Sequence, residues 1–142
     1  MTQLKLSDVS TFIGTLFPEH DSLIFENAID RNAKKSIGVF TAPEARMGKT
    51  ETYGGKAYAP VEKFPVNILI RWTDDSSICE DFVNEMYQKL SSVGNNFFIR
   101  DKDYTSAKIA YFHMLDSNAI WLGRETDNVC EYSIRVDIYY YN

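Results

Sequence analysis

The C-terminal stretch Val129–Asn142 constrains the fold more than any other part of the chain, because polar and apolar residues alternate along it. The residues on one side of this two-residue period are apolar: Tyr132, Ile134, Val136, Ile138 and Tyr140. Such alternation predicts a long β-strand with one face in the core and the other toward solvent. Tyr139 and Tyr141 then place large rings on the polar face, which indicates that a helix, a loop or another subunit covers that face.

The bulk composition narrows the class of protein. The chain has 142 residues, enough for one domain with its own core. Its 15 basic and 20 acidic side chains give a net charge of −5, without the cationic surplus of a general nucleic-acid binder. Cys79 and Cys130 form neither a disulfide framework nor a Cys-x-x-Cys metal pair. With no apolar run near the ~18 residues of a membrane span and no signal pattern, we expect a single domain made in a cytoplasm with reduced thiols.

Two segments have helical periodicity. Apolar residues recur at helical spacing over residues 7–17, where Ser7 is a candidate cap and Pro18 stops the run. The second helix runs from about Ser77 to Leu90, with Ser77 and Glu80 in the pattern of a capping box and Gly94 shortly after it. Both segments predict helices with one apolar face.

The remaining apolar runs predict strands. They are Ser22–Asn27, Lys35–Thr41, Val66–Trp72, Asn96–Arg100, Lys108–Leu115, Ala119–Arg124 and the final stretch. Residues 42–63 are bracketed by Gly and Pro and contain few apolar residues, which predicts a long loop or an extended arm. This loop carries four basic residues: Arg46, Lys49, Lys56 and Lys63. The order of elements predicts an α+β fold, a mainly antiparallel sheet with two principal helices packed on one face.

Residues Pro43–Thr50 resemble a phosphate-binding loop because they end in Gly48, Lys49 and Thr50. Pro43 stands where that motif needs glycine, and it removes an amide donor from the cradle. Gly54 and Gly55 also interrupt the helix that should follow. We therefore interpret the segment as part of a basic loop and not as a nucleotide site.

Other combinations of residue types also fall short of an active site. His113 and Cys130 can meet across strands as base and nucleophile, but a core thiol and a strand histidine are the far commoner explanation of these residues. The acids around the second helix fit helix capping and a solvated face: Asp74, Asp75, Glu80, Asp81 and Glu85. Trp72 and Trp121 suit either a ligand platform or core and interface anchors. We predict no catalytic residue, no metal site and no cofactor.

The second half of the chain resembles a known family in three successive segments. A strand reads Phe-Pro-Val-Asn-Ile-Leu-Ile-Arg at residues 64–71, and a helix ends Glu-Met-Tyr-Gln-Lys-Leu at residues 85–90. The chain then closes on Val-Cys-Glu-Tyr-Ser-Ile-Arg-Val-Asp-Ile-Tyr-Tyr at residues 129–140. These segments resemble the strand, helix and final strand of the minor capsid or tail-terminator proteins of long-tailed bacteriophages. The likeness covers about Phe64 to Asn142 and rests on pattern and order.

The resemblance implies an α+β subunit without cofactor or catalysis that forms a homo-oligomeric, hexameric ring in the virion. That ring would cap the tail tube protein, join it to the head–tail connector and contact passing DNA only transiently. On this reading Trp121, Tyr139 and Tyr141 are the expected subunit interface. The basic residues of loop 42–63 are expected to line the channel or reach a neighbour. Two alternatives stay open: another head–tail neck component, or a small-molecule-binding α+β domain with Trp72, Trp121, His113 and Cys130 around its pocket.

Overall fold

A computed structural model of the protein describes residues 4–42, 61–93 and 108–141. The described chain begins with helix α1 (Leu6–Leu16), a 3-10 helix η1 (Pro18–Leu23) and strands β1 (Ile24–Glu26) and β2 (Lys35–Thr41). Strand β3 (Val61–Trp72) leads into helix α3 (Ser76–Ser91). The last elements are β4 (Lys108–Met114), β5 (Ile120–Arg124) and β6 (Cys130–Tyr141). This is the α+β fold that the sequence predicts.

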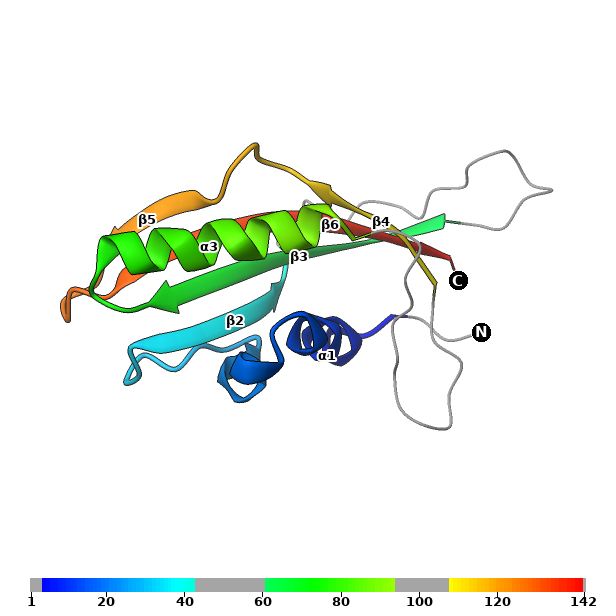
Figure 1. The fold of residues 1–142 in the computed structure, drawn as a ribbon. Helices are drawn as coiled ribbons and strands as arrows, with labels where there is room; N and C mark the ends of the chain where they lie inside the picture. The colour runs from blue at the N-terminus through cyan, green and yellow to red at the C-terminus, as the bar shows by residue number, and fades with distance from the viewer. Residues whose placement is uncertain (1–3, 43–60, 94–107, 142) are drawn as a thin grey trace.

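The strands form one mixed sheet around β3 and β6 (Figure 1). The order is β1-β2-β3-β6-β4, with β5 also paired to β6, and only the β1–β2 pair is parallel. Strands β4 and β5 run antiparallel to different halves of β6, so together they behave as one interrupted edge strand. A register shift lies in each of them, between Ile109 and Tyr111 and between Trp121 and Gly123.

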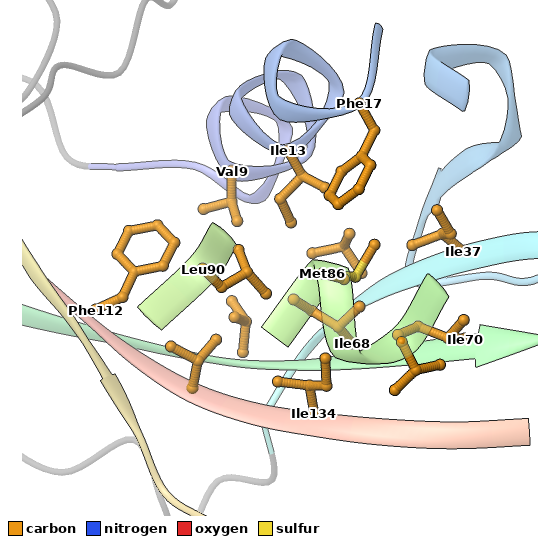
Figure 2. Close-up of a cluster of buried hydrophobic side chains, with 14 of the residues drawn as sticks. Val9, Ile13, Phe17, Ile37, Ile68, Ile70, Met86, Leu90, Phe112 and Ile134 are labelled. Atoms are coloured by element: carbon orange, nitrogen blue, oxygen red, sulfur yellow. The ribbon is translucent and has the colours of Figure 1, made fainter. Parts of the chain in front are cut away.

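Both principal helices pack on the same face of the sheet, as predicted. Figure 2 shows Val9 and Ile13 of α1, together with Phe17 directly after it, gathered with Met86 and Leu90 of α3 over the isoleucines of the sheet. The sheet contributes Ile37, Ile68, Ile70 and Ile134 to this core. Each fully buried side chain of this size stabilises the fold by roughly 1.5–3 kcal/mol. We call this side the helix face and the opposite side, which carries Arg71, Glu131 and Tyr139, the outer face.

The predicted helix starts were wrong in detail. Helix α1 is capped by Lys5 and not by Ser7, and the Lys5 backbone N–H donates to the Asp8 carboxylate at 2.8 Å. Helix α3 is capped by Asp75, whose carboxylate accepts from the backbone N–H groups of Ser77 and Ile78 at 3.0 and 3.3 Å. Asp75 has extended φ and ψ, which aim its side chain at these two free donors. Ser77 therefore lies inside the first turn.

The described structure includes both ends of the predicted loop 42–63. Strand β3 already begins at Val61, so Lys63 is a strand residue that pairs with Tyr139 of β6. At the other end, Ala42 is buried and its N–H donates to the Pro65 carbonyl. Proline fits within β3 because the pairing with β2 ends at Val66, one residue after Pro65 in the chain. The N–H that Pro65 lacks would face the β2 side, where its absence costs no ladder hydrogen bond. Arg46, Lys49, Lys56 and the predicted strand Asn96–Arg100 lie outside the described residues.

Candidate functional site

A cluster of charged side chains lies on the outer face where β3 ends. Arg71 is only 1% exposed. Its Nε and Nη2 donate to the carbonyls of Ala33 and Arg31, each at 3.0 Å. Its Nη1 donates to Glu131 at 3.3 Å, and Nη2 also bonds the Asp127 carboxylate. The buried guanidinium thus joins the segment before β2, strand β3, and the turn between β5 and β6.

A second arginine completes the cluster from the solvent side. Arg31 Nη1 donates to Glu131 at 2.9 Å and to Glu125 at 3.1 Å. The side chains around it line a cavity of about 380 Å³: Arg31, Asn32, Arg71, Glu125, Thr126 and Asp127. Two guanidinium groups facing three carboxylates give a formal charge of −1, which does not favour an anionic ligand. Every nitrogen of Arg71 is already hydrogen-bonded, so we interpret the cluster as a structural lock and not as a binding site.

This charged cluster makes the stability of the fold depend on pH under acidic conditions. The hydrogen bond from Arg71 holds the pKa of Asp127 below its ordinary value. The carboxylate therefore stabilises the fold above its unfolded pKa of about 3.9, and that contribution is lost as the pH falls through the lower, folded value. We expect urea unfolding to show a smaller acid-induced loss of stability in Asp127→Asn than in the wild type between neutral pH and about pH 3. Identical pH profiles would contradict this assignment.

The predicted interface residues differ in their exposure. Trp121 is 49% exposed and stacks edge-on against Tyr132 of β6, with ring centroids 5.1 Å apart. Tyr141 is 38% exposed. Tyr139 is only 8% exposed and stacks on Tyr111 with centroids 4.7 Å apart and an interplanar angle of 15°. In the single subunit Tyr139 therefore presents little of its ring, whereas Tyr111 is 42% exposed; the interface role of Trp121, Tyr139 and Tyr141 stays a prediction.

The residues proposed to line a small-molecule pocket do not converge. Trp72 is buried on the helix face, stacked on Phe82 at 3.7 Å, and offers no platform for a ligand. His113 is exposed and pairs with Asp137, seven residues along β6 from Cys130. Cys130 is instead buried beside Cys79, whose Sγ lies 4.0 Å from the Cys130 carbonyl. The hypothesis of a His113–Cys130 base and nucleophile is therefore wrong.

The buried thiols and the acidic residues around α3 have structural roles. Burial raises the pKa of the Cys79 thiol to about 12, so it stays protonated and unreactive at neutral pH. Asp75 caps α3, and Asp74 pairs with Lys34 at 3.6 Å. Within the described ranges, no group of three or more His, Cys, Asp or Glu residues is arranged to hold a metal ion. None of the helices that the structure describes is both long and apolar enough to cross a membrane.

The comparisons with known proteins assign no role to these surfaces. No protein-family model matches the sequence, and no curated protein shows significant similarity to it.

Sequence reasoning missed the Arg71 cluster altogether. Arginine is usually exposed, and Arg71 follows an apolar run that is explained without it. One signal in the sequence could have indicated the cluster. Arg71 lies on the polar side of one predicted strand, and Glu131 lies at the start of the polar side of another. Arg71 and Glu131 are direct partners in the β3–β6 register, and that pairing is a property of the folded sheet.

Proposed function

We propose that this protein is a structural subunit of a bacteriophage virion, a tail terminator whose ring caps the tail tube and joins it to the head connector. Support comes from the way the three segments of the family resemblance fit together. Strands β3 and β6 are direct neighbours, paired from Val61–Tyr141 to Arg71–Glu131, and the apolar face of α3 packs against them. The resembling segments thus form one continuous unit.

The observation that carries the proposal is the distribution of exposed apolar side chains. Five large hydrophobic residues of the described chain are exposed: Ile78, Tyr111, Trp121, Leu122 and Tyr141. Four of these form two pairs: Trp121 and Leu122 on β5, and Tyr111 on β4 with Tyr141 at the end of the neighbouring β6. Exposed apolar groups that lie together in this way mark surfaces that a protein partner covers. Burial of each ring contributes up to about 1.5–3 kcal/mol to such a contact.

A ring subunit needs no active site, and the interior chemistry of the described chain agrees with a structural role. The charged cluster is closed on itself, and the thiols are buried. The net charge of −5 suits a subunit around a channel that passes DNA without gripping it.

The proposal is tested by measuring the mass of the purified protein in solution, alone and after mixing with tail-tube protein. We expect a species of about six times the 16.3 kDa of one chain, and rings at one end of the tubes in electron micrographs. Rings that bind head connectors but never tubes would favour the alternative of another neck component. A protein that stays monomeric under both conditions would refute both assignments.

A further inference from the structure

The exposed apolar residues of β4, β5 and β6 form two separate patches. The β5 patch consists of Trp121 and Leu122, and the tyrosine patch consists of Tyr111 and Tyr141. Trp121 pairs with Tyr132, and Tyr111 pairs with Tyr139. These partners are seven residues apart on β6, which corresponds to roughly 23 Å at ~3.3 Å per residue.

The patches also point to opposite sides of the sheet. Residues directly opposite each other on paired strands project to the same face, and odd and even positions of one strand project to opposite faces. Tyr132 lies on the helix face with Ile134 and Val136, so Trp121 projects to that side. Tyr139 lies on the outer face, so Tyr111 projects there. No single copy related by a two-fold axis through one patch covers both.

The charges beside the two patches are complementary. Glu80 of α3 is exposed and precedes Tyr87 by seven residues, or about two helical turns, and the Tyr87 hydroxyl donates to the Asp116 carbonyl between β4 and β5. Residues at this spacing lie on the same side of a helix, so Glu80 lies on the side of α3 that faces β5. Lys63 lies beside the tyrosine patch, because it is the cross-strand partner of Tyr139. Within the described part of the chain, neither Glu80 nor Lys63 forms an ion pair.

The edge itself is poorly suited to extending the sheet. Strands β4 and β5 are short, each contains a register shift, and the chain between them leaves the ladder around Asp116. Arg135 holds that segment in place through two hydrogen bonds to the Asp116 carboxylate, at 2.7 and 2.9 Å. Interruptions and bulges of this kind prevent an edge from pairing with a second strand. A partner must therefore use side chains.

We infer that a second copy of this chain is the occupant, and that the contact is head-to-tail: the β5 patch of one subunit packs on the tyrosine patch of the next, with Glu80 facing the neighbour's Lys63. Two different, complementary patches on opposite sides of one subunit are what a closed ring requires, because each copy then gives one surface and receives the other. This inference rests on the proposed function for the existence of the ring, but it specifies which surfaces meet.

Two single variants, separately and mixed, test the arrangement. Trp121→Asp removes the β5 patch and Tyr141→Asp removes the tyrosine patch, and each alone is expected to lower self-association at least about tenfold. An equimolar mixture retains one intact contact, so it is expected to give a one-to-one dimer that grows no further. Ile78→Asp, at an exposed residue of α3 outside both patches, is the control and is expected to assemble like the wild type. Circular dichroism checks that each variant is folded.

Charge reversal gives an independent readout. Glu80→Lys and Lys63→Glu are each expected to weaken association roughly tenfold, and the double variant is expected to recover most of the loss. Two sets of results would show that this contact is wrong although the wild type forms rings, and the proposed ring would then stand. In the first, both aspartate variants still assemble. In the second, their mixture stays monomeric and the double charge reversal shows no recovery. A wild type that never self-associates overturns both.

Discussion

Arg71→Ala is expected to lower the free energy of unfolding by about 3–5 kcal/mol, the range for removing one partner of a buried, hydrogen-bonded charge network. The substitution leaves the carbonyls of Ala33 and Arg31 without their donor and leaves the buried Glu131 carboxylate with only Arg31. Urea unfolding of the wild type and the variant, followed by circular dichroism, measures the difference.

Arg135→Ala is the matched control for this prediction. Arg135 lies on the same face of the neighbouring strand and also binds a carboxylate, that of Asp116, but its side chain is 44% exposed. Solvent screens an exposed pair, so the expected loss is less than about 1 kcal/mol. Equal effects of the two substitutions would show that the burial of Arg71 has no energetic consequence and that the interpretation of a structural lock is wrong.

The two tryptophans provide the second large contrast. Trp72→Ala is expected to cost about 3–5 kcal/mol of stability, because the indole is buried and packs against Phe82 and His20, with the ammonium group of Lys35 over its ring. Trp121→Ala removes a half-exposed ring and is expected to change the stability of the dilute monomer by no more than about 1 kcal/mol.

Thermal or urea unfolding at low protein concentration separates these outcomes, and sedimentation at high concentration adds the second readout. Trp121→Ala should weaken assembly while leaving the subunit folded, whereas Trp72→Ala should destabilise the subunit itself. A large loss of monomer stability from Trp121→Ala would place that ring in the core and remove it from the proposed interface.

Long, strongly patterned elements could be predicted from the sequence. The alternation in residues 129–142 is sufficient for β6, and the apolar stripe of α3 is sufficient for its buried face, because each signal spans many residues. The one-residue details failed where several polar residues competed for one role. Ser7 and Ser77 are good caps by type, yet the backbone placed Lys5 and Asp75 at the helix starts.

The surface properties depended on contacts between distant parts of the chain. Tyr139 stacks on Tyr111, which comes 28 residues earlier and meets it only when β4 pairs with β6. Arg71 is buried because Arg31 and Asp127 lie in loops that fold over the end of β3. No local pattern contains these contacts, so the two exposed residues of the predicted interface, Trp121 and Tyr141, were distinguishable from Tyr139 only in the structure.

The central position of β6 has a consequence for the synthesis of the protein. Three strands that leave the ribosome earlier, β3, β4 and β5, all find their hydrogen-bonding partner in this last one. One edge of β3 therefore stays unpaired until β6 has left the ribosome. We expect the nascent chain to remain unfolded until β6 has emerged and then to collapse in one cooperative step, since distant pairings of this kind cannot form sooner.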